Sequence, residues 1–358
     1  MLQELYCITF EPLINYNNMK KTIFYLGFVL SISRLVAQSN YVILNKIHLD
    51  GDGGYDYLTA DKTNNRLYIS HGNIVQVLDV ESKKVLANIP AKRVHGITIA
   101  DDLNKGYISN GQDSSVTVFD LTTLKTIKNV KVTGANPDAI LYDKFSKKVF
   151  AFNGRSNNAT VIDAKTDLVA ATIALSGKPE FSASDENGKV YVNIEDKNEI
   201  TVINTTTLKA ERTWSIAPGE EPTGLALDNK THRLFSVCGN KLMMIVNAET
   251  GKVSTSLPIG DGCDGVAFDT ELKRAYSSNG EGTVTVVQEE NENTYKVIET
   301  IKTEKGARTI TVNSKTHHVF LPVAEREEAP KATPENPRPR AAFKPNSFTI
   351  IELGETAK

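Results

Sequence analysis

An aromatic residue recurs along the chain at a nearly constant interval. It follows an apolar residue and precedes a short polar turn, and the spacings between its copies are 39, 43, 41, 44, 41 and 44 residues. The positions are Tyr68, Tyr107, Phe150, Tyr191, Phe235, Tyr276 and Phe320. Seven copies in phase are hard to obtain by chance, so the chain is restricted to repeat architectures such as solenoids and propellers.

Each copy contains the same succession of strands and turns. Before the aromatic anchor stand an alternating segment, as in 224–228 (GLALD), and a polar turn, as in 185–189 (DENGK). After it come a second turn, often Asn-Gly, a period-two strand ending in an acid or amide, as in 116–120 (VTVFD), and a last strand, as in 168–174. Four short antiparallel strands in ~40 to 45 residues are typical of a propeller blade. The predicted fold is therefore an all-β, seven-bladed β-propeller.

The ends of the chain predict how the propeller closes. The seventh copy supplies strands at 319–321 and 348–352, and the chain stops at Lys358 without a fourth strand. The segment 41–49 (YVILNKIHL) resembles the outer strand at 168–175 (LVAATIAL). We expect this N-terminal strand to complete the seventh blade, which removes an open sheet edge.

Residues 1–37 are predicted to be a leader outside the propeller, which we expect to span 38–358. Lys20 and Lys21 precede an apolar run at 22–32 (TIFYLGFVLSI) that is too short to span a bilayer comfortably, and Ala37 is a suitable small residue for cleavage. This pattern is typical of a signal peptide and predicts a periplasmic or extracellular protein with no transmembrane span in the mature chain. Residues 1–18 precede the basic region, which indicates Met19 as the true start.

Composition narrows the class of partner. The chain has 41 basic and 43 acidic side chains, so no positive excess favours nucleic acid, and its single tryptophan offers no broad stacking platform. Of three cysteines, Cys7 falls in the leader. Cys238 and Cys263 are expected on neighbouring blades, where they could form a disulfide in an oxidising compartment or remain two unpaired thiols.

The repeats also carry a resemblance to a known family. Segments 67–80 (LYISHGNIVQVLDV), 106–120 (GYISNGQDSSVTVFD) and 149–163 (VFAFNGRSNNATVID) resemble the YVTN repeat. The chain from about Tyr41 to Leu353 is similar to YncE-type seven-bladed propellers of bacterial envelopes. The resemblance implies the fold but not a ligand, because related architectures include surface-layer domains, lactonase-type propellers and parts of cytochrome-linked oxidoreductases.

Two loops of every blade are expected to emerge on one face. Residues at the start of each inner strand lie 12 positions before the anchor, or 11 in the fourth copy, and are Asp56, His95, Asp138, Glu180, Thr223, Asp264 and Arg308. Residues three positions after the anchor are His71, Asn110, Asn153, Ile194, Cys238, Asn279 and Val323. Glu195, which directly follows Ile194, is included with them. Together they predict a polar, net acidic axial face that binds a ligand.

A simpler interpretation is that these side chains cap turns, as Asp and Asn commonly do at strand starts. For Asp138 we expect a cap on the turn after Pro137. Capping accounts poorly for His95, Glu180 and Arg308 at equivalent places, whereas a ligand of low symmetry would require such variety.

Two specific hypotheses follow for this face. Asp56, His71 and His95 could converge as a site for a divalent metal, the one cofactor considered. Alternatively, His95 and the carboxylates could act as general acid and base on a sugar lactone, with Arg308 holding a substrate carboxylate. The chain lacks GxSxG, P-loop, CxxCH and HExxH motifs, so no catalytic residue is assigned.

A proline-rich insertion at about 325–346 interrupts the seventh copy. It is expected to be a solvated extended loop, or else a lid or an arm that docks a partner. His232, His317 and His318 are expected on the opposite face in solvent. The predicted function is an exported, monomeric module that binds a small molecule or an envelope protein, with a lactonase-like or lyase-like enzyme as the alternative.

Overall fold

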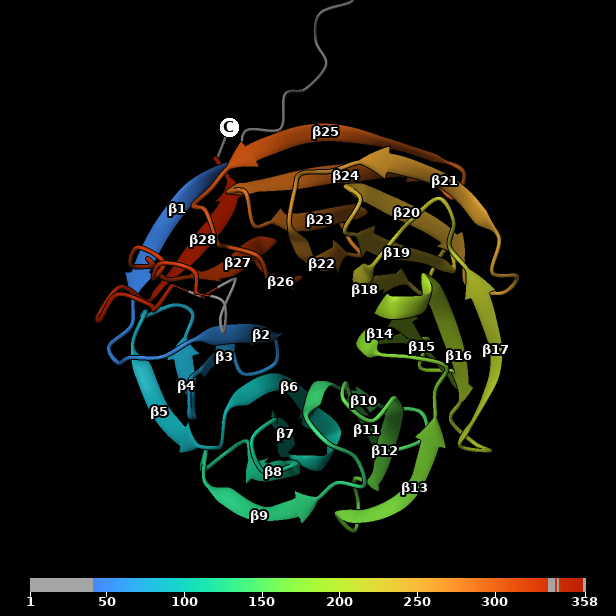
Figure 1. Ribbon diagram of the computed structural model, residues 1–358, viewed down its shortest axis with the longest axis horizontal. Coiled ribbons are helices and arrows are strands. Elements are labelled where there is room, and N and C mark those ends of the chain that lie inside the picture. Colours follow the sequence, from blue (N-terminus) through green and yellow to red (C-terminus); the bar gives the residue numbers. More distant parts are fainter. Residues whose placement is uncertain (1–40, 334–338, 340, 357–358) are drawn as a thin grey trace, which may run out of the picture. The chain divides into compact units, whose positions relative to one another are not determined.

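The computed structural model describes residues 41–333, 339 and 341–356. In this part of the chain, seven four-stranded antiparallel sheets stand around a common axis (Figure 1). The predicted all-β, seven-bladed propeller is thereby confirmed. The predicted leader, including Cys7, Ala37 and the proposed start at Met19, lies outside the described residues.

Strands follow one another from the axis outward in each blade. Blade 1 contains β2 (Tyr55–Asp61), β3 (Arg66–His71), β4 (Ile74–Asp79) and β5 (Val85–Pro90). Blade 2 contains β6 (Val94–Ala100), β7 (Lys105–Asn110), β8 (Ser115–Asp120) and β9 (Thr126–Lys131). Blade 3 contains β10 (Pro137–Asp143), β11 (Lys148–Asn153), β12 (Asn158–Asp163) and β13 (Leu168–Ala174). Blade 4 contains β14 (Pro179–Ser184), β15 (Lys189–Ile194), β16 (Glu199–Asn204) and β17 (Lys209–Ser215).

The remaining blades follow the same order. Blade 5 contains β18 (Pro222–Asp228), β19 (Arg233–Cys238), β20 (Leu242–Asn247) and β21 (Val253–Pro258). Blade 6 contains β22 (Cys263–Asp269), β23 (Arg274–Asn279), β24 (Thr283–Asn291) and β25 (Thr294–Lys302). Blade 7 contains β26 (Thr311–Asn313), β27 (His318–Val323), β28 (Thr349–Glu355) and β1 (Tyr41–His48).

The hydrophobic core lies between the blades. Seven apolar clusters can be traced in the described residues, and each joins the facing sides of two neighbouring sheets. The aromatic anchors are at most 2% exposed, and each belongs to a cluster shared with the next blade. Burying one such side chain contributes about 1.5 to 3 kcal/mol, so the repeating anchor supplies a repeating interface.

The N-terminal strand is the outer strand of blade 7, where β1 pairs antiparallel with β28 (Figure 1). Tyr41, at its start, also contacts blade 6: its hydroxyl lies 2.6 Å from that of Tyr276 and accepts a hydrogen bond from Arg274 Nη1 at 2.9 Å. The predicted closure of the propeller by the N-terminal strand therefore agrees with the sheet.

One hydrogen bond recurs on the face predicted to carry the site. In blades 1 to 6 this bond joins two backbone groups. The donor is the N–H of the residue four positions after the anchor, and the acceptor is the carbonyl oxygen two positions before the inner-strand residue. Examples are Gly111 to Arg93 and Gly154 to Asn136, both at 3.0 Å. The inner-strand loop and the loop between the second and third strands therefore lie together.

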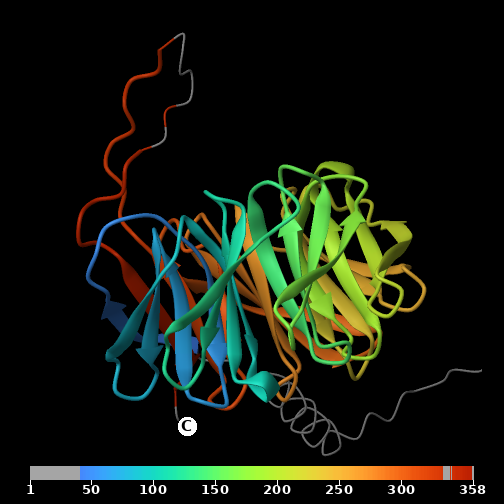
Figure 2. The same cartoon turned by 90° about the horizontal axis from the view of Figure 1, so that it is seen from below.

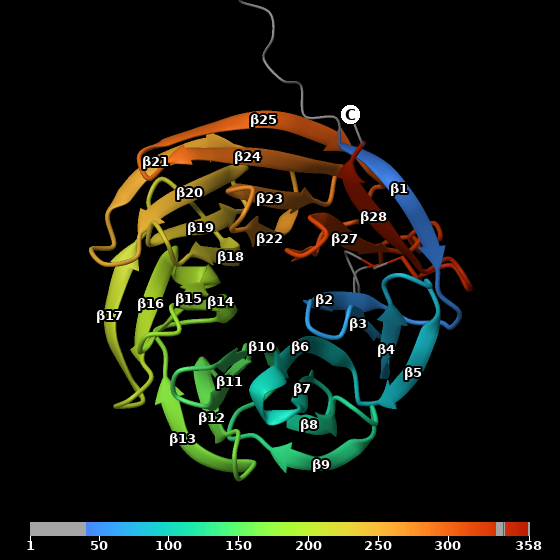
Figure 3. The ribbon, with the colours of Figure 1, turned by 180° about the vertical axis from the view of Figure 1, so that it is seen from behind.

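Two short 3-10 helices mark the faces. η2 (Glu195–Lys197) lies on this same face, toward the viewer in Figure 1, and η1 (Asp101–Leu103) lies on the opposite face, toward the viewer in Figure 3. Within the described residues, no helix is long and apolar enough to span a membrane.

The described parts of the proline-rich insertion form a stem that rises from the site-bearing face (Figure 2). Arg326 and Phe343 form an antiparallel bridge, and Lys344 donates its backbone N–H to the carbonyl of Glu325 at 2.9 Å. The Arg326 guanidinium lies 4.2 Å from the centre of the Phe343 ring, and that ring packs on Tyr55 at 5.5 Å. These contacts anchor the base of the insertion on blade 1, while residues 325–333 are extended and exposed to solvent.

Candidate functional site

A backbone irregularity places the inner-strand residues. In blades 1 to 6 the register between the first and second strands shifts beside this position, as between Val94 and Ile97. Such a bulge re-aims the side chain of the extra residue. In blade 2, Ser109 Oγ accepts the backbone N–H of Gly96 at 2.7 Å and so fixes the bulge from the second strand. We call the seven residues the axial set: Asp56, His95, Asp138, Glu180, Thr223, Asp264 and Arg308.

Five consecutive members of the axial set alternate in charge. His95 Nδ1 donates a hydrogen bond to Asp56 Oδ2 at 2.7 Å and lies 3.7 Å from Asp138 Oδ1. On the other side of Asp56, Arg308 Nη2 lies 3.7 Å from Oδ1, while Arg308 Nη1 pairs with Asp264. The side chains of the three aspartates are only 16% to 19% exposed. The predicted convergence of the axial set is therefore present in this part of the site.

Glu180 obtains its counter-charge from outside the axial set. Lys178 Nζ lies 2.7 Å from Glu180 Oε1 and also pairs with Glu195 at the start of η2. Lys178 comes from the loop before β14, two positions before Glu180, and was not among the predicted site residues. Its side chain brings Glu195, which was predicted, into the same group.

Three carboxyl groups of the site hold their protons unusually strongly. Burial raises the pKa of Asp138 to about 6, and the negative charge of Asp56 adds to this rise. Burial also raises the pKa of Asp264 to about 6, although the charge of Arg308 opposes it. For Glu180, burial and then the charge of Asp138 raise the pKa to about 8. A cation placed among these groups would relieve their mutual repulsion.

Two aromatic side chains meet across the axis next to this set. Tyr57 and Phe181 each follow an axial residue by one position, and their ring centres are 4.4 Å apart. They come from β2 and β14, which stand on opposite sides of the axis in Figure 1. Burial raises the pKa of the Tyr57 hydroxyl well above its ordinary value, and the axial carboxylates add to the rise. Tyr57 thus remains a neutral phenol with an aromatic face beside the acids.

The orientation of His95 depends on a glycine. A Cβ atom added at Gly111 would lie 2.5 Å from His95 Nε2, so only glycine leaves room for the imidazole there. Nε2 is buried without a hydrogen-bond partner among the described residues, and Nδ1 faces the carboxylates. Burial lowers the pKa of His95, but the hydrogen bond to Asp56 and the charge of Asp138 outweigh it and leave the pKa raised. Because Nε2 is covered, it is poorly placed as a general base.

Several predicted site residues lie elsewhere. His71 is 2% exposed, bonds through Nδ1 to Gln76 Oε1 at 2.8 Å and packs on Phe348, so it does not join Asp56 and His95 in a metal site. The predicted amides serve their own hairpins, since each donates to side chains that begin the third strand of its blade; they are Asn110, Asn153 and Asn279.

The capping role predicted for Asp138 is also wrong. Among the described residues, its carboxylate accepts no hydrogen bond from a backbone amide, and its nearest charged partner is His95. The bulge turns the side chain toward the neighbouring blade instead of the turn after Pro137.

Of the two alternatives left open for Cys238 and Cys263, the structure has the unpaired thiols and not the disulfide. Both are free, buried cysteines, and Cys263 Sγ donates a hydrogen bond to the Cys238 carbonyl oxygen at 3.1 Å. Burial raises the pKa of each thiol to about 12. The prediction that neighbouring blades bring them together was correct, but in the structure they pack as small apolar residues.

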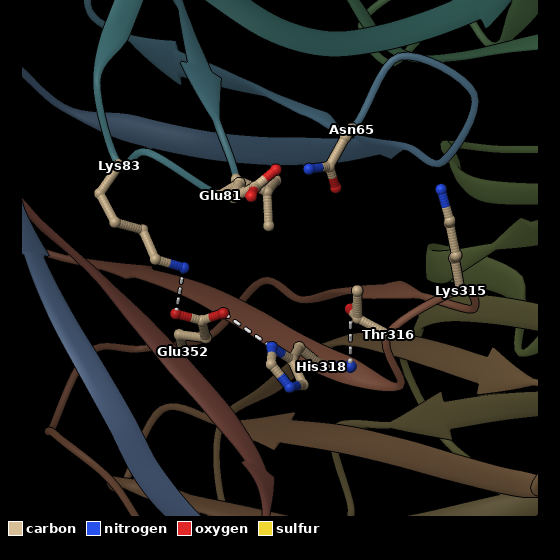
Figure 4. A pocket seen from close by; sticks show the side chains of 8 residues that line it. Asn65, Glu81, Lys83, Lys315, Thr316, His318 and Glu352 are labelled. Atoms are coloured by element: carbon tan, nitrogen blue, oxygen red, sulfur yellow. Dashed lines mark hydrogen bonds and ion pairs between the residues drawn. The ribbon is translucent and has the colours of Figure 1, made fainter.

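The opposite face contains a cavity of about 340 Å³ between blades 1 and 7 (Figure 4). Glu352 in its wall receives Lys83 Nζ at 2.6 Å and His318 Nδ1 at 2.8 Å. On the same face, His317 Nδ1 lies 2.7 Å from Asp269 Oδ2. His317 and His318 were predicted to be solvated, but each instead pairs with a buried carboxylate.

A pattern in the sequence could have located the aromatic pair. The position after the axial residue is glycine or alanine in blades 2, 3, 5 and 6 but aromatic in blades 1 and 4, where it is Tyr57 and Phe181. Large residues at two positions of a repeat that otherwise keeps small ones indicate that these blades fill the axis. No comparable signal distinguishes Gly111 from the other glycines of its hairpin position.

Comparisons with known proteins support the fold more strongly than a function. No protein-family model matches the chain. It is similar to Antigen Lp49 of Leptospira interrogans, with 25% identity over 229 residues that make up 57% of this chain and 48% of that protein. The chain thus spans about half the length of this curated relative. A solved structure, Kuenenia stuttgartiensis hydrazine synthase, aligns with a TM-score of 0.69 and 16% identity over 87% of this chain and 98% of that one. At that identity the likeness concerns the fold alone.

Proposed function

We propose that the chain is a propeller of the YncE type that binds a small cationic ligand at the axial site. The observation that carries the proposal is a charge imbalance. Arg308 and Lys178, the permanent cations of the site, contact four carboxylates, which are Asp56, Glu180, Glu195 and Asp264, and a fifth, that of Asp138, contacts neither of them in the described part of the chain. Half-buried negative charge of this kind favours a cation, and the adjacent faces of Tyr57 and Phe181 add cation–π attraction.

We further propose that the protein is exported. The basic, apolar and small-residue segments at 19–37 support export, as does the name of its Leptospira relative, an antigen. Fractionation of cells that express the chain, followed by N-terminal sequencing, tests this proposal. We expect a mature protein in the periplasm or medium that begins near Gln38, whereas an intact N-terminus in the cytoplasm would contradict export.

Calorimetric titration of the purified chain tests the binding function. The panel contains spermidine, arginine and ethylammonium as organic cations, Mn²⁺ and Zn²⁺ as metal ions, and citrate as an anion. We expect at least one cation to bind with an affinity that falls as salt is added, because the site is only partly shielded from solvent. Citrate should not bind.

A matched pair of double variants separates the site from overall charge. Asp138→Asn with Glu180→Gln should weaken binding at least about tenfold, since each removes a carboxyl group that would ionise beside a bound cation. Glu81→Gln with Glu249→Gln removes two charges from exposed turns on the opposite face and should leave binding unchanged. Equal losses in the two double variants, or tight binding of citrate, would refute the proposed function.

A further inference from the structure

Asp56, His95 and Asp138 stand on three consecutive blades and bring one donor atom each to within 4.8 Å of the others. From this geometry we propose that the three side chains bind one divalent transition-metal ion, an inference that rests on the proposed cation-binding function. The donors are His95 Nδ1 and one carboxylate oxygen each from Asp56 and Asp138. This set differs from the one expected from sequence, because Asp138 takes the place of His71.

The distances between donors suit a single ion. His95 Nδ1 is 2.7 Å from Asp56 Oδ2 and 3.7 Å from Asp138 Oδ1. For metal–ligand bonds of about 2.1 Å, adjacent donors of an octahedral ion are about 3 Å apart and opposite donors about 4.2 Å apart. Small side-chain rotations bring all three atoms into that range. The three residues occupy equivalent bulges, so their backbones are held by the same register shift in each blade.

The imidazole is already turned for this role. Because Nε2 is covered at Gly111, Nδ1 is the nitrogen that faces the axis and the two carboxylates. Arg308 does not replace the ion, since its Nη1 pairs with Asp264 and its Nη2 is 3.7 Å from Asp56. Asp138 has no arginine or lysine within ion-pair distance in the described part of the chain.

The donor set indicates the class of metal. One imidazole and two carboxylates suit transition ions such as Zn²⁺ and Mn²⁺, whereas Ca²⁺ and Mg²⁺ prefer oxygen ligands throughout. We therefore expect Zn²⁺ and Mn²⁺ to bind more tightly than Ca²⁺ or Mg²⁺, with water molecules completing the coordination.

The test uses the full chain without a polyhistidine tag, stripped with EDTA and then dialysed. ZnCl₂ or MnCl₂ alone is titrated by calorimetry, and bound metal is counted by elemental analysis after gel filtration. We expect one equivalent of metal. His95→Ala and Asp138→Asn should each weaken binding by about 30-fold or more, as expected for loss of a direct ligand.

A glycine pair provides the matched control. Gly111→Ala should weaken metal binding about tenfold or more, because the new methyl group displaces the imidazole. Gly154→Ala places a methyl group at the same hairpin position of blade 3, where nothing lies closer than 3.8 Å, and should bind metal as the parent does. Circular dichroism and the thermal midpoint confirm that each variant is folded.

The outcomes distinguish this inference from the function on which it rests. If organic cations bind but Zn²⁺ and Mn²⁺ do not, the metal site is refuted and the cation-binding function stands. The same conclusion follows if folded Gly111→Ala and Gly154→Ala bind metal equally well. If no cation of either kind binds, both proposals fail.

Discussion

Asp120 and Asp163 end the third strands of blades 2 and 3, and each accepts hydrogen bonds from two backbone amides of the turn that follows. Backbone hydrogen bonds lower the pKa of Asp120, and the hydrogen bond from Lys148, with those of the turn, lowers the pKa of Asp163 to about 2. Asp138, Glu180 and Asp264 show the opposite pKa shift, because they accept no backbone hydrogen bond of this kind among the described residues and are buried near one another. The direction of the pKa shift therefore distinguishes acids that cap turns from the buried acids of the axial site.

The raised pKa of Glu180 predicts how the stability of the protein depends on pH. Its pKa of about 8 exceeds the ordinary value of 4.5, so the folded state holds a proton that the unfolded state has lost between those values. The free energy of unfolding should consequently fall as pH rises from about 4.5 to about 8. Glu180→Gln removes this dependence and should stabilise the protein by on the order of 2 kcal/mol at pH 9, with little gain at pH 5.

Thermal melts of parent and variant at pH 5 and pH 9 check this prediction. Glu195→Gln serves as the control, because it removes the other carboxylate on Lys178 without a comparable gain at high pH. If Glu180→Gln changes the melting temperature equally at both pH values, the carboxyl group is ionised throughout and the prediction is wrong.

Strands could be predicted from the sequence more reliably than the contacts between blades. The predicted strands agree with the structure because the anchor, the alternation and the turn residues repeat in every copy, and each signal is local. The bulges, the contact of Tyr57 with Phe181 and the fit of His95 against Gly111 depend on side chains more than ten, or more than a hundred, positions apart. Apart from the large residues at positions 57 and 181, the sequence carries no pattern that records such contacts, which is why the axial positions could be predicted and the pairing of their side chains could not.

The stem at Arg326 and Phe343 leads to a prediction at this scale. Phe343 holds it to blade 1 through Tyr55, so Phe343→Ala should increase the rate of trypsin cleavage within 325–346 about tenfold, because local opening becomes easier. The melting temperature of the propeller should change little. Phe145→Ala, which removes a ring that is 54% exposed in a turn, should cleave like the parent. Equal rates for both variants would show that the stem does not depend on Phe343.

Closure of the propeller is a property of the whole molecule. The side chain of Glu352 in β28 is 2% exposed, and it joins β28 to β1 through Asn45 and to blade 1 through Lys83. Burial alone would raise its pKa, but the hydrogen bonds from His318, Lys83 and Asn45 lower it to about 2. This stabilisation is complete above the ordinary pKa of 4.5 and disappears as pH falls toward 2.

Glu352→Gln should therefore cost about 3 kcal/mol of unfolding free energy at pH 7, and the difference from the parent should shrink between pH 5 and pH 3. Urea denaturation at several pH values measures both effects. Glu290→Gln breaks an exposed pair with Lys296 and should cost less than about 0.5 kcal/mol. A difference for Glu352→Gln that is constant with pH would contradict the role assigned to its ionised form.

The pairing of β1 with β28 also has a consequence for the order of folding. Tyr41 lies opposite Glu355, so the first strand of the propeller finds its partner only after six blades have left the ribosome. Until then β1 and the unfinished seventh blade are exposed sheet edges, which are prone to pairing with other chains. A nascent chain that crosses a membrane unfolded would avoid this interval in the cytoplasm, because all seven blades could then assemble at once on the far side.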